Sequence, residues 1–193
     1  MTRGRRLRRA FYARSPLELA PDLLNKVLVA DGCAGRVVEV EAYCGSDDPG
    51  SHAYRGSTPR TEVMFGQAGH LYVYFSYGMH WCANVVAEQP GTAGAVLLRA
   101  VTPIQGIELI RSRRPTAKRP RDLCSGPAKL TQALGIDGSH DGADLVSAEQ
   151  GLTIVDDGTP PPHRPGRSPR IGLTQGADRP WRWFVEGSDD LSR

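Results

Sequence analysis

Hydrophobic residues along this chain come in short alternating or continuous runs, a pattern typical of β-strands rather than long helices. These runs predict strands over residues 27–30, 36–43, 71–75, 81–87, 95–101 and 181–185. The third and fourth runs are close enough to predict a hairpin, with Tyr77-Gly78-Met79-His80 at its tip.

Helix start and stop signals lie between these runs. Ser15 is a candidate N-cap for a short leucine-rich helix. A second helix is expected over residues 104–113, and a third over residues 125–134 with Gly135 as its C-cap. Together the elements predict an α+β fold, with a curved, largely antiparallel β-sheet, a protruding β-hairpin and helices packed on the sheet.

Length and composition narrow this picture to one domain. The 193 residues, 39% hydrophobic and 23% charged, are enough for a sizeable core and exclude collagen, coiled coil and wholesale disorder. Residues 1–14 stand apart because they contain six arginines and no acid. They predict a disordered basic arm, which leaves residues 15–193 as the folded domain.

Charge is concentrated rather than large. The net charge is +3, but residues 1–14 and residues 99–129 each carry +6. Of the 24 basic residues 21 are arginine, whose planar guanidinium suits phosphate contacts. The blocks therefore indicate a polyanion partner, with solvated loops in an arginine-biased proteome as an equal alternative.

Several classes of protein are excluded by what the sequence lacks. The four cysteines are scattered, without a C-x-x-C pair or a histidine at ligand spacing, so we expect no metal site, no cofactor and no disulfide scaffold. The N-terminus lacks the apolar core of a signal peptide. Residues 63–87 contain no charged side chain, but polar residues and glycines interrupt them, so burial in a folded domain is favoured over a membrane span.

The strand over residues 36–43 is a candidate for chemistry. Strict alternation places Val37, Glu39, Glu41 and Tyr43 on one face. The ordinary alternative is an exposed polar face. The functional interpretation is a carboxylate held in a cleft, where it deprotonates a water.

Aromatic residues gather nearby in the sequence. Tyr72 and Tyr74 share one strand face, while Tyr77 sits in a turn where core packing does not require a large ring. Such rings, flanked by arginines, suit a protein that unstacks and holds a nucleobase, although most strand aromatics are core residues. Asn84 and Arg99, on adjacent predicted strands, are candidates for polar contacts in the same pocket, or for polar sheet edges.

Ser125 precedes Gly126 and Pro127 at the start of the third predicted helix. A helix N-terminus presents free N–H groups that suit a phosphate or a bound water. The alternative is an ordinary cap.

Taken together, these segments resemble the alkyladenine DNA glycosylase (N-methylpurine DNA glycosylase) family. The resemblance runs in family order over about residues 15–187. It rests on GRVVEVEAY at 35–43, His52, TPR at 58–60 with MF at 64–65, GHLYVYFSYGMHWCANV at 69–85, VLLRA at 96–100 and LCSGPAKL at 123–130.

The resemblance implies a monofunctional, purine-specific DNA N-glycosylase over residues 15–193. Such an enzyme flips alkylated or deaminated purines out of double-stranded DNA, hydrolyses the N-glycosidic bond and so starts base excision repair. It also implies a monomer in a bacterial cytoplasm, associated with the nucleoid, with no membrane partner. The implied site residues are Glu41 as general base, Arg99 and the backbone near Ser125 as holders of the water, Tyr43 and His52 as one wall of the base pocket, Tyr74 as the opposite wall, Asn84 as a barrier to guanine and Tyr77 as the intercalating wedge.

Two other functions stay open. A non-catalytic DNA-damage sensor would share the pocket and wedge, and an RNA-binding or formyltransferase-like β domain would share the fold class. For neutral lesions a general acid would help, and Glu39 is a candidate with no further support.

Overall fold

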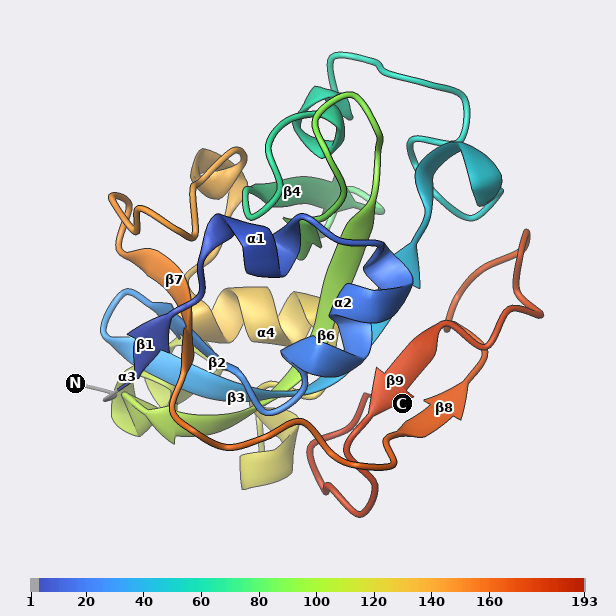
Figure 1. Cartoon of the computed structure of the whole chain (residues 1–193). Helices are drawn as coiled ribbons and strands as arrows, with labels where there is room; N and C mark the ends of the chain where they lie inside the picture. Colours follow the sequence, from blue (N-terminus) through green and yellow to red (C-terminus); the bar gives the residue numbers. More distant parts are fainter. Residues whose placement is uncertain (1–3, 193) are drawn as a thin grey trace.

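The computed structural model describes residues 4–192, and these residues contain nine β-strands joined in one sheet (Figure 1). The main path runs β1-β7-β2-β3-β6-β5-β4, every neighbouring pair is antiparallel, and the sheet curls strongly into a half-barrel. The strands are β1 (Arg5–Arg6), β2 (Val27–Ala30), β3 (Cys33–Tyr43), β4 (Leu71–Ser76), β5 (His80–Val86), β6 (Ala95–Gln105), β7 (Leu152–Asp156), β8 (Gly166–Ser168) and β9 (Arg182–Phe184). The predicted α+β class and single-domain organisation are confirmed.

Four α-helices accompany this sheet in the described chain: α1 (Arg9–Tyr12), α2 (Pro16–Leu23), α3 (Ile107–Arg113) and α4 (Pro127–Leu134). Ser15 caps α2 as expected, because its side chain accepts a hydrogen bond from the Leu17 N–H at 3.3 Å. The second helix begins later than predicted, at Ile107, since β6 continues through Pro103 to Gln105. Gly135 ends α4 in the left-handed conformation, with φ of 68°.

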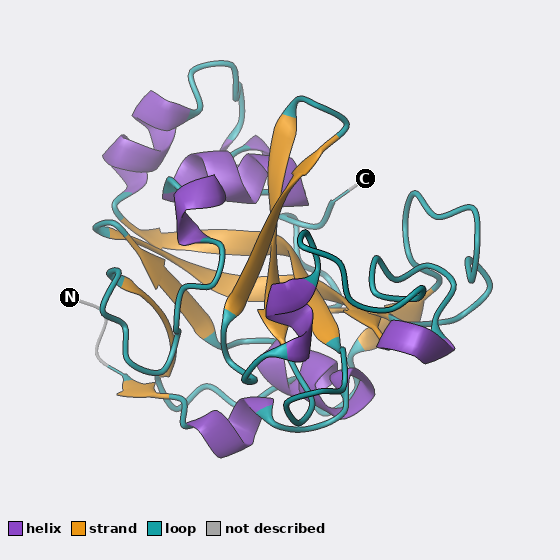
Figure 2. Cartoon of the chain, turned by 90° about the horizontal axis from the view of Figure 1, so that it is seen from above, coloured by secondary structure: helices purple, strands orange, loops and turns teal. Residues whose placement is uncertain are grey.

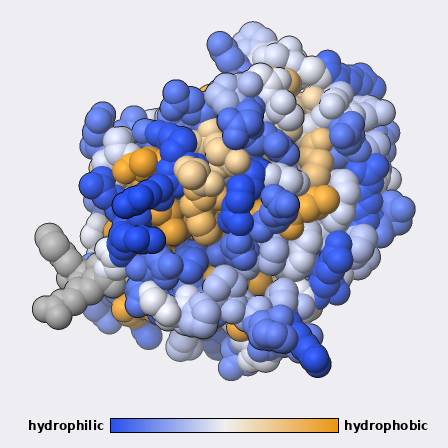
Figure 3. All heavy atoms as spheres, in the orientation of Figure 1, coloured by the Kyte–Doolittle hydropathy of each residue, from blue (hydrophilic) through white to orange (hydrophobic). Residues whose placement is uncertain are grey.

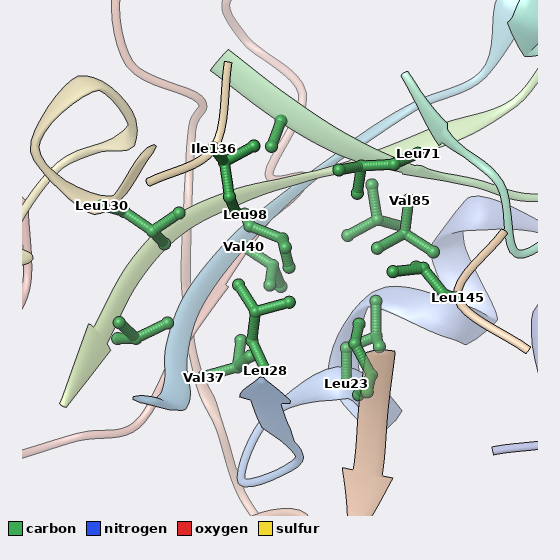
Figure 4. Packing of buried hydrophobic residues seen from close by; sticks show 14 of the residues in the cluster. Leu23, Leu28, Val37, Val40, Leu71, Val85, Leu98, Leu130, Ile136 and Leu145 are labelled. Carbon is green, nitrogen blue, oxygen red and sulfur yellow. The ribbon is translucent and has the colours of Figure 1, made fainter. Parts of the chain in front are cut away.

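Burial of apolar side chains between the sheet and the helices forms the main core. Residues from β2, β3, β4, β5, β6, α2 and α4 point toward one another there (Figure 4). The labelled members are Leu23, Leu28, Val37, Val40, Leu71, Val85, Leu98, Leu130, Ile136 and Leu145. Because both faces of the central strands are covered, side chains on the face opposite this core are also withdrawn from water.

The expectation of a disordered arm over residues 1–14 is wrong for the part that the structure describes. β1 adds to the edge of the sheet beside β7, and Tyr12 of α1 is fully buried. Arg9 also forms an ion pair with Asp144 at 2.7 Å. An unpaired strand edge and a few apolar side chains suffice to order the segment despite its positive charge. Residues 1–3 lie outside the described part of the chain.

The β4–β5 hairpin projects beyond the surrounding elements, as Figure 2 shows from above. This confirms the predicted hairpin. Its inner part is buried in the sheet, while the tip exposes Tyr77 and Met79. None of the helices in the described residues has the length and apolar character that a membrane crossing requires. On the face drawn in Figure 3, hydrophobic residues form small patches between hydrophilic ones.

Candidate active site

A pocket of about 430 Å³ opens beside the β4–β5 hairpin, on the face of the sheet opposite the main core. Strands β3 to β6 supply its lining together with the loops around residues 50–52 and 171–173. Most of the predicted site residues meet here. The pocket is lined by Tyr43, His52, Tyr74, Tyr77, Asn84 and Arg99, among others.

Aromatic rings form one side of this pocket. Tyr72 and Tyr74 point to the same face, as predicted, and their rings stack at 5.4 Å between centroids. His52 meets the edge of Tyr74 at 4.5 Å, and its Nδ1 lies 3.1 Å from the Tyr72 hydroxyl. A purine stacked between two rings needs about twice a van der Waals contact, roughly 7 Å. His52 and Tyr74 therefore do not stand as opposite walls in this arrangement.

A β-bulge in β3 decides which side chains face the pocket. Val37 lies opposite Val101 of β6 and Glu39 lies opposite Ala100, so Val38 has no partner in this register. One extra residue reverses the alternation of a strand. Val37 consequently joins Val40 in the core, which corrects the prediction that it shares the face of Glu39. Glu39 and Glu41, beyond the bulge, stay on the other face.

Glu41 exposes no surface, and three residues that contact it, Tyr43, Arg99 and Ile171, line the pocket. Its Oε1 accepts the Ile171 N–H at 2.8 Å and lies 3.1 Å from Nη1 of Arg99. Its Oε2 accepts the Tyr43 hydroxyl at 2.9 Å. Burial and the nearby Glu41 carboxylate raise the pKa of Tyr43 above its ordinary value, which keeps its hydroxyl protonated and able to donate. The three donors compensate much of the cost of burying a carboxylate.

Glu39 is equally buried, and of its contact partners only Arg99 lines the pocket. It accepts hydrogen bonds from Arg99 at 2.9 Å, from Arg182 at 2.7 Å, and from both the amide and the hydroxyl of Ser192 at 2.6 Å. Burial alone would raise the pKa of Glu39, but the bonds from Ser192 and Arg182 and the charge of Arg99 hold it below its ordinary value. An ionised carboxylate has no proton to donate, so this geometry argues against Glu39 as a general acid.

Asn84 occupies the pocket wall on β5, where it is 4% exposed. It pairs with Tyr72 of β4 and with Leu97 of β6 in the sheet. Its side-chain amide donates to the Tyr72 carbonyl oxygen at 3.2 Å. That bond fixes the position of the amide group at the pocket surface.

Tyr77 stands at the tip of the hairpin with 86% of its surface exposed. The Met79 N–H donates to the Ser76 carbonyl at 3.1 Å and closes a turn whose central residues, Tyr77 and Gly78, have φ of 51° and 65°. A non-glycine residue in the left-handed region costs about 1 kcal/mol, and an exposed ring recovers nothing from burial. Folding stability does not explain a tyrosine here.

The family model of methylpurine-DNA glycosylase matches residues 10–189. The chain belongs to the methylpurine-DNA glycosylase family. A relative from Burkholderia lata named "Putative 3-methyladenine DNA glycosylase" is 57% identical over 190 residues, covering 98% of this chain and 92% of the relative. Relatives of the same name from Streptomyces avermitilis and Chlorobaculum tepidum are both 48% identical, covering 96% and 98% of this chain and 90% and 91% of their own lengths. The chain is thus a DNA glycosylase, a DNA-repair enzyme that excises alkylated bases.

Ser125 does not itself line the pocket of this glycosylase, but Pro127, the first residue of α4, does, and the backbone of Ser125 pairs with Ala100 beside Arg99. Gly126, not Ser125, is the N-cap residue of α4. The Ser125 hydroxyl accepts a hydrogen bond from Lys129 at 3.3 Å and lines a separate, basic depression with Arg119 and Arg121. Among the described residues, the backbone group that bonds to Glu41 is the amide of Ile171, from a different segment.

Four residues of the glycosylase site were missed from the sequence: Ile171, Ser192, Arg182 and Arg170. All four follow residue 165, in a part of the chain where the sequence pattern predicted only the strand over residues 181–185. A backbone amide leaves no mark in a sequence. Of the four, only Arg182 lies in a predicted element, the strand over residues 181–185. The local pattern does not predict that this strand pairs with β3.

Proposed function

We propose that this glycosylase turns an alkylated or deaminated purine nucleotide out of duplex DNA and hydrolyses its N-glycosidic bond with a water activated by Glu41. The observation that carries the proposal is the fully buried Glu41 carboxylate beside an aromatic pocket of about 430 Å³. Burying a carboxylate costs free energy of folding, and buried ionisable groups beside a pocket are typical of catalytic sites. A role in the excision of damaged bases accounts for Glu41 at this position.

The water has a place to bind. A carboxylate oxygen accepts up to two hydrogen bonds. Within the described residues, Oε2 of Glu41 is bonded to the Tyr43 hydroxyl alone, which leaves one acceptor position for a water. In the proposed step Glu41 takes a proton from this water, the water oxygen bonds to the sugar C1′, and the electrons of the glycosidic bond leave with the purine nitrogen.

The pocket suits a purine that has become a good leaving group. Alkylation at N3 or N7 gives the base a positive charge, which favours stacking on electron-rich rings. Burial raises the pKa values of Tyr72 and Tyr74 above their ordinary values, so both rings stay neutral. Because His52 touches Tyr74 in this arrangement, a base between them requires the His52 side chain to move aside.

Extrusion of a nucleotide leaves a hole in the duplex, and Tyr77 is placed to fill it. Its exposed ring projects from the hairpin beside the pocket that it helps to line. Unstacking costs a few kcal/mol and costs least at damaged or poorly paired bases, so the extrusion step itself selects lesions.

Duplex DNA also needs phosphate contacts. In the N-terminal basic block two arginines are engaged within the fold, since Arg9 pairs with Asp144 and Arg14 with Asp22. The block over residues 99–129 presents Arg111, Lys118 and Arg121 at the surface or in the depressions beside α4. We assign the phosphate contacts to this second block, with affinity that falls steeply with salt.

The proposed reaction needs one chain, because the pocket, Glu41 and Arg99 belong to the same domain. We therefore propose a monomer without cofactor. The relatives named above come from bacteria and carry the name of a DNA glycosylase, which supports our proposal that the protein works on nucleoid DNA in the cytoplasm.

Single-turnover base release tests the proposal. Wild type and Glu41→Gln are incubated with duplexes that carry one hypoxanthine, ethenoadenine or N-methylated purine, and free base and abasic sites are measured. We expect release by wild type and, in Glu41→Gln, retained lesion binding with release lowered by several orders of magnitude. Binding without release by either protein would indicate a damage sensor, and full release by Glu41→Gln would remove Glu41 as the base.

A further inference from the structure

Arg99 is held in place by hydrogen bonds to two residues that do not line the pocket, Glu39 and Ser192. Its Nε donates to Glu39 at 2.9 Å and to the Ser192 hydroxyl at 3.2 Å, and its Nη2 donates to the same hydroxyl at 2.9 Å. Only Nη1 is turned toward Glu41. Arg99 itself is 6% exposed and lines the pocket, whereas Glu39 and Ser192 do not.

Ser192 is the junction of this network. Its hydroxyl donates to Glu39 Oε1 and accepts from two nitrogens of Arg99, while its amide donates to Glu39 Oε2. The residue is 8% exposed and follows β9 in a segment without regular structure. Ser192 therefore links the segment after β9 to Arg99 in the pocket.

The network also balances charge. The positive charge of Arg99 is shared between Glu41 and Glu39, and Arg182 offsets the second carboxylate. If Arg99 faced Glu41 alone, the ion pair would favour the ionised carboxylate more strongly, and Glu41 would be a poorer acceptor of a proton. A general base needs a partner that orients it without removing its basicity.

We propose that Glu39 and Ser192 are positioning residues, which hold Arg99 beside Glu41 and share its charge, so that the rate of base hydrolysis depends on a serine of the segment after β9. The proposal rests on the proposed function, since it concerns the same Glu41. It adds two residues that act through Arg99 rather than on the DNA.

The two carboxylates, Glu41 and Glu39, face charged and titratable groups from several elements. Those facing Glu41 are Tyr43 of β3, Arg99 of β6 and Arg170 of the loop before Ile171, and those facing Glu39 are Arg99 and Arg182 of β9. Of these, only Arg99 contacts both carboxylates directly. Substitutions at Ser192 and Glu39 should therefore act by displacing Arg99.

The test compares Ser192→Ala, Ser192→Thr and Glu39→Gln with wild type on a duplex containing one ethenoadenine. The control is Ser188→Ala, from the same segment, whose hydroxyl takes part, within residues 4–192, only in a local bond from the Asp190 amide at 3.3 Å. Affinity for the lesion duplex, the single-turnover rate of base release and its pH profile are measured for each protein, together with thermal unfolding. The same lesion serves throughout, so its own titration cancels in the comparison.

We expect Ser192→Ala to release base about tenfold more slowly, the rate factor that corresponds to one hydrogen bond, with lesion affinity little changed. Ser192→Thr, which restores the hydroxyl, should recover most of the rate, and Ser188→Ala should match wild type. Glu39→Gln should move the acidic limb of the rate profile to lower pH, because Arg99 then faces Glu41 alone.

Wild-type rates and pH profiles in both Ser192→Ala and Glu39→Gln would overturn the proposal. The proposal would also be overturned if the rate of base release fell only in proportion to thermal stability, or if the variants failed to fold, while Ser192→Thr recovered no rate and the acidic limb did not shift. If wild type releases no base from any lesion, the proposed function fails first, before the variants are compared.

Discussion

Arg170 and Asp48 form a two-pronged ion pair, with N–O distances of 2.5 and 2.7 Å, in which neither side chain is exposed. The Arg170 guanidinium also lies 4.6 Å from the Tyr43 ring centroid and donates to the Ala42 carbonyl at 2.9 Å. Arg170 immediately precedes Ile171, whose amide binds Glu41. The pair thus joins the loop around Asp48, the site strand β3 and the segment that supplies Ile171.

Removing one member of this pair should destabilise the fold strongly. Asp48→Asn leaves the Arg170 charge buried without its partner, and breaking such a pair costs about 3–5 kcal/mol. Urea denaturation measures the loss. The control is Asp47→Asn, since the neighbouring Asp47 is exposed. Equal, small effects of the two substitutions would contradict a stabilising role for the buried pair.

Replacement of Tyr77 by serine should weaken binding of lesion duplexes far more than binding of single strands, because only a duplex has a gap for the ring to fill. Stability should change little, as the side chain is 86% exposed. Affinities for matched duplex and single-stranded oligonucleotides measure the difference. Tyr54→Ser is a suitable control, since Tyr54 is also exposed but does not line the pocket. Equal losses on both substrates would show that Tyr77 is not a wedge.

Shortening Asn84 should relax the exclusion of guanine. Asn84→Ala enlarges the pocket at β5 and removes the donor to the Tyr72 carbonyl, which itself lowers stability by about 1–3 kcal/mol. The measurement is free guanine released from undamaged duplex DNA by wild type and variant. If the variant remains folded and releases no more guanine than wild type, Asn84 does not set this selectivity.

Stability should depend on pH through His52. Burial, together with the charge of Arg60, lowers the pKa of His52 below its ordinary value of 6.5. The unfolded chain therefore binds more protons at this position when the pH falls below about 6.5. The stability from neutral His52 is complete above that pH and decreases as the pH falls toward the lowered pKa.

The corresponding measurement is urea denaturation of wild type and His52→Gln between pH 5 and 7.5. Wild type should lose stability relative to the variant as the medium becomes more acidic, while other groups, such as His70, contribute equally to both proteins. Parallel stability curves would show that His52 titrates normally in the folded state.

Much of the site could be predicted because it follows from strand geometry. The two-residue period of β3 places Glu41 and Tyr43 on one face, where the Tyr43 hydroxyl bonds to Glu41. The hairpin pattern likewise places Tyr77 at a tip, and the antiparallel register brings Asn84 beside Tyr72. In each case the residues concerned are neighbours in the chain or lie in adjacent hairpin strands.

The errors arose where alternation or local signals were interrupted by the tertiary fold. The bulge at Val38 turned Val37 into the core, and the Ser125 side chain lines a separate depression, although Pro127 of the same helix start lines the pocket. The described part of the arginine-rich segment, from residue 4 on, is ordered because the edge of β7 offers it a partner.

The pattern of hydrophobic, polar and turn residues along the sequence was enough to predict the α+β class, the projecting hairpin and the shared face of Glu39 and Glu41. These features depend on side-chain periodicity and on turn residues. Which groups surround the carboxylates was decided by the folded chain alone. The Ile171 amide lies 130 residues from Glu41 in sequence, and Ser192 lies 153 residues from Glu39. Buried charges require donors from whichever segment packs over them, and only the path of the chain through β9 and the loops around it brings these segments there.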